Sequence, residues 1–347
     1  MASTDINSIQ EFLQASDSQY KFIDMGRGLR ELSASQLSDI EAQRSPAPYP
    51  RQQCMWLGCI FWNAQLAQQQ YIWFIKLPLD ERGLLNLAAR NLFLEKVVEA
   101  LGTQLQHTAQ QQGQLGDNPY TFVPSQQQRA DFNAKAKTLL GQAPSEGFNA
   151  VCDHLQSPQH QDWQLLSVQG VADYVARLSD PMLAATLQQQ WPQLAANLQI
   201  AILNSMEHYH INKPLAVMVK QHYKQADVAA NTAHISASIR ALSQAPTSIA
   251  SSVVEGLLQR PYLSEDVLIL LAARHMGMIS SVALACAFLE HCALHEDDLF
   301  NGLFADMVQL PQCRIYFLQA IQSPSLSQLC RNKIIALQQH NHTKPAQ

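Results

Sequence analysis

One short segment of the chain combines aromatic and charged residues in a pattern that suits binding. Trp73 lies in an aromatic run that leads directly into Asp80, Glu81 and Arg82. An acidic pair and an arginine at the mouth of an aromatic sheet could bind a ligand or hold a partner peptide. The alternative is a strand-to-helix junction, where Asp80 caps the helix and Glu81 lies in its first turn. Our candidate binding residues are therefore Trp73, Asp80, Glu81 and Arg82, and we predict no catalytic residue.

Histidines form two groups that could suggest a metal site. His208 and His210 are two residues apart, and such residues point to different faces of a helix. His291 and His295 are one turn apart and could face one ion, but no His-Glu-x-x-His pattern supplies a further ligand. The other residues of these groups are His222, His234, Glu290 and Glu296. We predict surface or helix-capping histidines, with no metal and no cofactor.

A glycine pair after the first strand has part of a dinucleotide-binding pattern. The segment GRGLRE, residues 26–31, has Glu31 where the third glycine would stand. The next predicted strands form a hairpin, so no βαβ unit surrounds a pyrophosphate. We therefore predict turn glycines at Gly26 and Gly28. Gly-x-Ser-x-Gly, Cys-x-x-Cys and phosphate-loop motifs are also absent from the sequence.

The strands that would position the candidate residues all fall in the first 102 residues. Apolar alternation or continuous apolar runs predict strands over residues 19–25, 54–62 and 70–77. The last two would pair as an antiparallel hairpin. Residues 54–62 are apolar on both faces, which predicts a central strand covered on both sides. Replacing Trp56 or Trp62 by Ala should then cost about 3 to 5 kcal/mol.

Helices and a linker complete the predicted organisation. In the first part, helices are expected from Ser33 and over residues 84–101. Residues 103–125 are Gln-rich and contain Pro119 and Pro124, so we predict a loop or linker. From residue 126 to 340 the apolar spacing is helical throughout, and residues 341–347 would be a flexible tail.

The last third of the chain has regularly spaced helix starts. They recur about every 15 residues, so a helix pair spans about 31 residues. The predicted starts are Ser248, Ser264, Ser280, Glu296, Pro311 and Ser325. The fold class is therefore mostly α, with a small N-terminal α+β unit (1–102) followed by an all-helical array. That array is either a HEAT-like α-solenoid or an irregular helical bundle.

The amino-acid composition limits the classes of partner that the protein could bind. The 347 residues include 23 Lys plus Arg and 28 Asp plus Glu, for a net charge of −5. No basic field is present to hold nucleic acid or an anionic membrane, so we expect neither as a partner. The seven cysteines are odd in number and mostly lie in apolar runs, which indicates a reducing compartment. With no signal peptide or long apolar segment, we expect a cytoplasmic protein.

Three segments resemble a bacterial family that is known only as a domain of unknown function. They are FIDMGR (22–27), WFIKLPLDERG (73–83) and SVQGVADYVARL (167–178). The resemblance spans nearly the whole chain. It implies no catalytic residue, substrate or cofactor, and suggests only that Leu79, Asp80 and Glu81 are a family hallmark.

Three functions remain open at this point. The first is an interaction or scaffold protein that binds a protein on the helical array. The second is an enzyme of unrecognised type, with a pocket between the two parts near Asp80, Glu81 and Arg82. The third, binding of single-stranded nucleic acid by the hairpin aromatics, needs basic neighbours, and only Lys76 and Arg51 qualify. We favour the first function, although the sequence does not determine the biochemical activity.

Overall fold

The computed structural model describes residues 7–63, 70–104, 118–158 and 162–343. The chain divides into two compact units, Met1–Pro124 and Ser125–Gln347, which we call unit 1 and unit 2. The predicted Gln-rich linker (103–125) lies largely outside the described residues, and the predicted tail (341–347) lies partly outside them.

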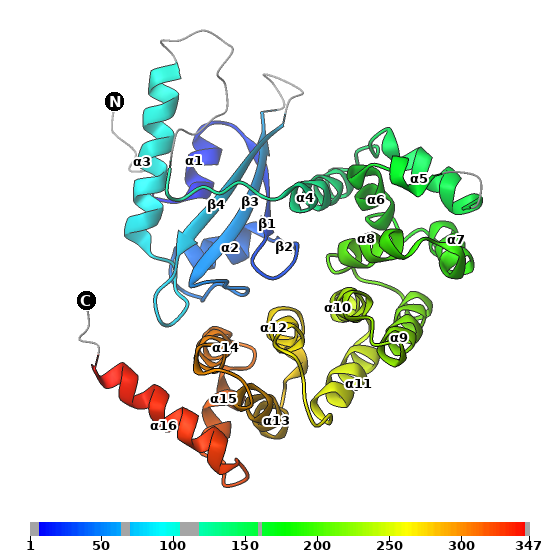
Figure 1. Cartoon of the computed structure of the whole chain (residues 1–347). Helices are drawn as coiled ribbons and strands as arrows, with labels where there is room; N and C mark the ends of the chain where they lie inside the picture. Colours follow the sequence, from blue (N-terminus) through cyan, green and yellow to red (C-terminus); the bar gives the residue numbers. More distant parts are fainter. Residues whose placement is uncertain (1–6, 64–69, 105–117, 159–161, 344–347) are drawn as a thin grey trace. The chain divides into compact units, whose positions relative to one another are not determined.

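Unit 1 contains a four-stranded antiparallel sheet in the order β2-β1-β3-β4 (Figure 1). The strands are β1 (Gln19–Asp24), β2 (Arg30–Leu32), β3 (Cys54–Trp62) and β4 (Tyr71–Pro78). The three predicted strands and their hairpin are confirmed, and β3 is central. β2 is an addition, because its three residues are too few to show an alternating pattern. It follows a turn in which Gly28 has φ 100°, as predicted for a turn glycine.

Three helices cover one face of this sheet. They are α1 (Ile9–Ala15), α2 (Ala34–Glu41) and α3 (Leu87–Gln104). α2 begins after Ser33, as predicted, with a complete capping box. α3 begins later than predicted, because Leu85 pairs with Leu79 in a β-bridge. Asn86 then accepts a hydrogen bond of 3.0 Å from the N–H of Ala89. α1 is too short to give a clear helical period.

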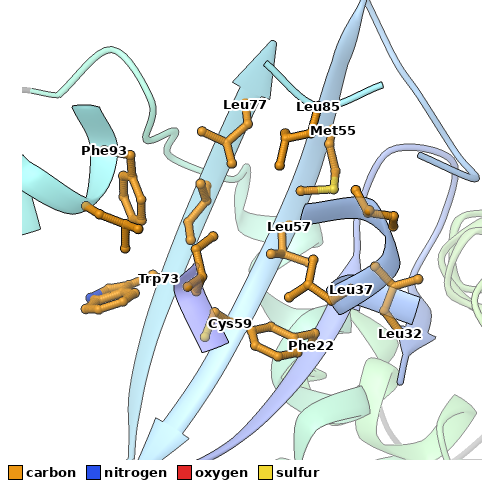
Figure 2. Close-up of a cluster of buried hydrophobic side chains, with 14 of the residues drawn as sticks. Phe22, Leu32, Leu37, Met55, Leu57, Cys59, Trp73, Leu77, Leu85 and Phe93 are labelled. Atoms are coloured by element: carbon orange, nitrogen blue, oxygen red, sulfur yellow. The ribbon is translucent and has the colours of Figure 1, made fainter. Parts of the chain in front are cut away.

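The core of unit 1 lies between the sheet and these helices (Figure 2). Phe22, Cys59 and Trp73 are opposite one another on adjacent strands and point to the same side. Trp73 is 8% exposed, and its ring centroid lies 4.4 Å from that of Phe61 and 6.0 Å from that of Phe93. The helices contribute the buried side chains Ile9, Leu13, Leu37, Ile40, Phe93, Leu94 and Val97. One face of the sheet is therefore a continuous apolar core.

The outer edge of β4 is also paired. The N–H of Lys76 donates to the carbonyl of Tyr120 over 2.7 Å, and the N–H of Phe122 donates to the carbonyl of Phe74 over 3.2 Å. The end of the predicted linker thus pairs with β4 through an isolated β-bridge between Ile75 and Thr121. This contact satisfies backbone groups that an edge strand would otherwise leave open.

Unit 2 is helical, and no strand occurs in residues 126–158 or 162–343, as predicted. Its helices are α4 (Gln126–Leu139), α5 (Gly147–Gln156), α6 (Val168–Val175), α7 (Pro181–Gln190), α8 (Ala196–Met206), α9 (Lys213–Val228), α10 (Thr232–Ala241), α11 (Thr247–Leu258), α12 (Glu265–Arg274), α13 (Val282–Ala293), α14 (Asp297–Gln309), α15 (Arg314–Ala320) and α16 (Gln328–Thr343). The mostly α fold with an N-terminal α+β unit is therefore confirmed.

The helices of unit 2 pack in two rows. From α4 to α16, each even-numbered helix contacts the next even-numbered helix, and from α5 to α15 each odd-numbered helix contacts the next odd-numbered one. The two rows can be followed in Figure 1. Each helix thus packs on the helix two positions further along the chain. This pattern buries apolar side chains of each helix against its own row and, in pairs such as α5–α6 and α9–α10, against a sequence neighbour.

Several predicted helix starts agree with the observed caps. Ser264 and Glu296 precede α12 and α14, as predicted. α13 follows Ser281, whose hydroxyl accepts a hydrogen bond from the N–H of Leu284. α15 and α16 each begin three residues after the predicted starts, Pro311 and Ser325.

The first prediction concerns the tryptophans of unit 1. Trp56 and Trp62 are only half-buried, whereas Trp73 is buried. The large loss in free energy of unfolding that we expected for Trp56 and Trp62 is therefore expected for Trp73 instead. Trp73→Ala should lower the free energy of unfolding of unit 1 by about 3 to 5 kcal/mol, because it empties a packed core. Trp62→Ala, the matched control, should cost less than about 2 kcal/mol. Urea unfolding followed by circular dichroism measures both, and equal losses would contradict this assignment of the core.

Candidate functional site

The four candidate binding residues lie in two different environments. Trp73 belongs to the core of unit 1, with its ring among Phe12, Phe61 and Phe93. Asp80, Glu81 and Arg82 belong to the turn between β4 and α3. The structure therefore gives Trp73 a packing role and leaves only the turn at the surface.

Asp80 closes this turn with its side chain. Its Oδ1 accepts hydrogen bonds from the N–H groups of Arg82 (2.9 Å) and Leu84 (2.8 Å), and its Oδ2 accepts one from Nε of Arg82 (3.3 Å). Although burial raises the pKa of Asp80, these bonds and the Arg82 charge bring it below its ordinary value. Gly83 has φ 80°, a conformation that favours glycine. Asp80 therefore organises the turn, and it is not the helix cap of the predicted alternative, since α3 begins at Leu87.

Trp56 lies on the opposite face of the sheet, between two cations. The guanidinium carbon of Arg51 is 4.9 Å from a Trp56 ring centroid, and Nζ of Lys76 is 5.2 Å from it. Phe122 packs edge-on at 4.7 Å, and Nε1 of Trp56 donates to the Arg51 carbonyl over 2.9 Å. The basic residues that nucleic-acid binding would require are therefore already in contact with this ring.

Three histidines of unit 2 bond to backbone carbonyls of earlier elements. Because a carbonyl only accepts, each Nε2 carries a proton and the ring donates. The distances are 2.7 Å for His275 and Ile239, 3.1 Å for His291 and Leu258, and 2.7 Å for His295 and Leu263. The predicted surface position is therefore wrong for His291, which is 6% exposed, and for His295, whose side chain is 5% exposed. The carbonyl that His291 contacts belongs to the last residue of α11, so this ring does bond to a helix C-terminus. Packing of helices two apart in the chain brings these rings against carbonyls that no local spacing indicates.

The remaining histidines of the two groups divide between surface and interior. His210 is exposed, as predicted, whereas His208 and His234 are 8% and 7% exposed. Within the described ranges, no three His, Cys, Asp or Glu side chains are placed to hold a metal ion. Nor does that part of the chain contain a helix with the length and apolar character needed to cross a membrane.

A buried charged cluster joins four helices of unit 2. Glu207, at the end of α8, accepts two hydrogen bonds from Arg274 at the end of α12, of 2.6 Å from Nε and 3.1 Å from Nη2. Arg240 of α10 lies 3.6 Å from the same carboxylate. Nε2 of His208 lies 3.7 Å from Glu207 and 3.4 Å from Asp131 of α4. The sequence does not reveal this cluster, because its members are separated along the chain by whole helices.

The partners of Glu207 keep its carboxyl group ionised. Burial raises the pKa of Glu207, but Arg274, His208 and Arg240 outweigh this effect and lower it to about 2. Glu207 is therefore a carboxylate at neutral pH, fixed by a bidentate arginine. Such an arrangement suits a structural link between helices, and removal of one partner would leave a buried charge unpaired.

A polar cavity of about 500 Å³ lies among the three helices of unit 1. Two of its lining residues are Glu41 and Arg90, whose side chains are 2% and 5% exposed and whose charged groups are 3.7 Å apart. Oε1 of Glu41 also accepts a hydrogen bond of 2.7 Å from the N–H of Ile9. Burial raises the pKa of Glu41. This carboxyl group therefore links α1, α2 and α3.

An apolar groove of about 120 Å³ lies in unit 2, at the start of the array. Its walls come from α4, α6, α8 and the short turn before α6. The lining residues are Gln127, Trp163, Gln164, Leu166, Val168, Val171, Leu198 and Ala201. Leu165 is next to them in the chain and is 83% exposed, and Val168 is 37% exposed. The groove combines a hollow, an aromatic wall and exposed apolar side chains, which is typical of a contact surface.

The second prediction tests the charged cluster. Arg274→Leu should lower the free energy of unfolding by about 3 kcal/mol or more at pH 7, because Glu207 loses its bidentate partner. Arg44→Leu is the matched control, since the Arg44–Asp39 ion pair is exposed and should contribute at most about 1 kcal/mol. Urea unfolding of both variants provides the comparison. Equal losses of free energy of unfolding in the two variants would show that the buried cluster stabilises the protein no more than an exposed ion pair does.

The third prediction uses His275, whose pKa is lowered to about 4, mainly by burial. Because the unfolded chain binds the proton more readily, this ring contributes stability above pH 6.5 that is lost as the pH falls toward 4. Between pH 7 and pH 5 the loss should be about 2 kcal/mol. His275→Gln keeps a donor for Ile239 and should remove this part of the pH dependence. His210→Gln, at an exposed position, should leave it intact; an unchanged pH profile in His275→Gln would refute the assignment.

Comparisons with known proteins place both units in one family. A family model described as "Protein of unknown function (DUF3549)" matches residues 4–338. No curated protein and no solved structure matches the chain. The resemblance inferred from the sequence is confirmed, and the match covers nearly the whole chain. The chain therefore belongs to the DUF3549 family of proteins of unknown function.

Proposed function

We propose that this protein is a scaffold that binds another protein through unit 2. The supporting observation is the packing of each helix on the helix two positions ahead, in two rows. This packing supports the interpretation of unit 2 as a HEAT-like α-solenoid, a fold that exposes an extended surface instead of closing around a single core. Solenoids commonly bind partners along that surface.

The apolar groove between α4, α6 and α8 is the contact site in this proposal. Trp163, Leu166 and Leu198 provide its apolar walls, and the exposed Leu165 extends the apolar surface beside it. An apolar side chain from a partner would lose contact with water in this groove, while the rim residue Gln164 could bond to the partner's backbone.

The other polar groups considered as sites are already hydrogen-bonded within the protein, which supports binding over catalysis. In the turn where the enzyme hypothesis places its pocket, the oxygens of Asp80 accept hydrogen bonds from Arg82 and Leu84. Glu207 and Glu41 are engaged by arginines or backbone groups of their own unit. We further propose a cytoplasmic location, which is supported by seven free cysteines, five of them buried.

The fourth prediction tests the groove. Leu165→Glu puts a charge beside it and should reduce recovery of the specific partner at least about tenfold in affinity capture from the native cell, a loss of about 1.4 kcal/mol or more. Met182→Glu is the matched control, since Met182 is 78% exposed on α7 and does not line the groove. Both variants should unfold at the wild-type urea concentration, because neither side chain is buried.

Quantitative mass spectrometry after chemical crosslinking gives the readout. Crosslinks from residues 162–171 to one partner, lost in Leu165→Glu and kept in Met182→Glu, support the proposal. Equal recovery of the same partners by both variants refutes the groove as the contact site.

A further inference from the structure

Three rings form a continuous hydrogen-bonded chain across unit 2. Nε1 of Trp191 lies 3.3 Å from Nδ1 of His222, and Nε2 of His222 lies 2.7 Å from Nδ1 of His234. Trp191 belongs to the 3-10 turn that follows α7, His222 to α9 and His234 to the first turn of α10. The hydrogen-bonded rings therefore connect the end of α7 with α9 and α10, which are labelled in Figure 1.

The donor and acceptor roles in this chain follow from chemistry alone. An indole N–H only donates, so Nδ1 of His222 must accept and carries no proton. His222 is then neutral with its proton on Nε2, which points at Nδ1 of His234. That nitrogen must accept in turn, so His234 is also neutral, with its proton on Nε2. One arrangement of protons satisfies both hydrogen bonds.

An additional proton breaks this arrangement wherever it binds. On His222 it would occupy Nδ1 and set N–H against the N–H of Trp191. On His234 the proton would occupy Nδ1, and this N–H would donate to Nε2 of His222. His222 would then carry its own proton on Nδ1, where it again faces the N–H of Trp191. In both cases the His222–His234 contact can survive as a charge-assisted bond, but the bond to Trp191 is lost.

The surroundings of the chain favour the neutral form. Trp191 and His234 are 6% and 7% exposed, and His222 is half-buried. Burial is the main cause that lowers the pKa of His222, and a proton on the neighbouring His234 would lower it further. The amide of Gln199 on α8 donates to the Trp191 carbonyl over 2.8 Å, which fixes the backbone beneath the indole. Once its bond to His222 is lost, the buried indole N–H of Trp191 would lack a partner, at a cost in stability.

In the described part of the chain, the charged groups on neighbouring elements form no ion pair with His222 or His234. α7, the 3-10 turn after it and α8 contain no titratable residue. Lys220 bonds to Ser252, and Asp227 pairs with Arg260. The other titratable residues on contacting helices are Lys213, Tyr223 and Lys224 on α9, Arg240 on α10, Glu255 on α11, and Glu265, Asp266 and Arg274 on α12. Within the described ranges, none of these forms an ion pair with His222 or His234.

We propose that the Trp191–His222–His234 chain is a proton-sensitive joint of the helical array. With both imidazoles neutral, it holds the end of α7 against α9 and α10. Uptake of one proton releases Trp191 and loosens α7 while the helices further along remain folded. The proposal concerns the array itself and does not depend on which partner it binds.

The fifth prediction tests the joint in the full-length chain by nuclear magnetic resonance of ¹⁵N-labelled indole groups. The Trp191 signal is assigned by its loss in Trp191→Phe. The protection factor of this indole proton against solvent exchange should be high at pH 8, fall about tenfold per pH unit as the pH approaches the midpoint, and level off below it, as uptake of one proton requires. His222→Gln supplies an acceptor that does not titrate and should abolish this fall. His210→Gln, at an exposed position, should keep it.

Hydrogen–deuterium exchange separates the joint from general acid unfolding. Peptides covering 181–193 should lose protection before peptides covering 213–241 and 282–309 as the pH falls from 8 to 5. If His222→Gln does not fold, His234→Asn serves instead, and it should shift the pH midpoint of the indole signal. A Trp191 signal that stays constant from pH 8 to 5, an unaltered response in the variant, or simultaneous opening of all these peptides would overturn the proposal.

Discussion

The architecture of unit 2 depends on one constraint: a helix that packs on the helix two positions ahead covers polar backbone groups that must still be bonded. Buried carbonyls without a donor would cost stability comparable to a lost hydrogen bond. Histidine supplies that donor repeatedly, since His275 and His291 bond to carbonyls at the ends of α10 and α11. The same constraint sets the protonation of these rings, because Nε2 must carry a proton to donate.

Buried ion pairs also join helices that are far apart in the sequence. Glu207 joins α8 to α12 through Arg274, and His208 extends the contact to Asp131 of α4. In unit 1, Glu41 links α2 to α1 and α3 through Ile9 and Arg90. These groups have the burial that active sites often have, yet their partners are already supplied within their own unit. That is why our proposal places recognition at the apolar groove of unit 2 and not at these charged groups.

Much of the fold is predictable from local patterns. A period of two or a continuous apolar run identifies β1, β3 and β4, and Ser33 and Ser264 mark helix starts, because caps and pleats act within a few residues. β2 and α1 are too short to carry a period. The candidate site is less predictable: Asp80 and Arg82 lie in an exposed turn as expected, while Trp73 belongs to the core. Whether an aromatic strand residue faces helices or solvent depends on what packs against the sheet.

The sequence by itself determined the mostly helical class, the small antiparallel sheet, the family resemblance and the positions of most helices. Tertiary structure alone decided the roles of the polar residues. Ile239 and His275 are 36 residues apart and Trp191 and His222 are 31 apart, so no helical or strand period relates them. Such pairs form only when whole helices pack, and a hydrogen bond depends on distances of a few tenths of an ångström that packing sets and local propensity does not.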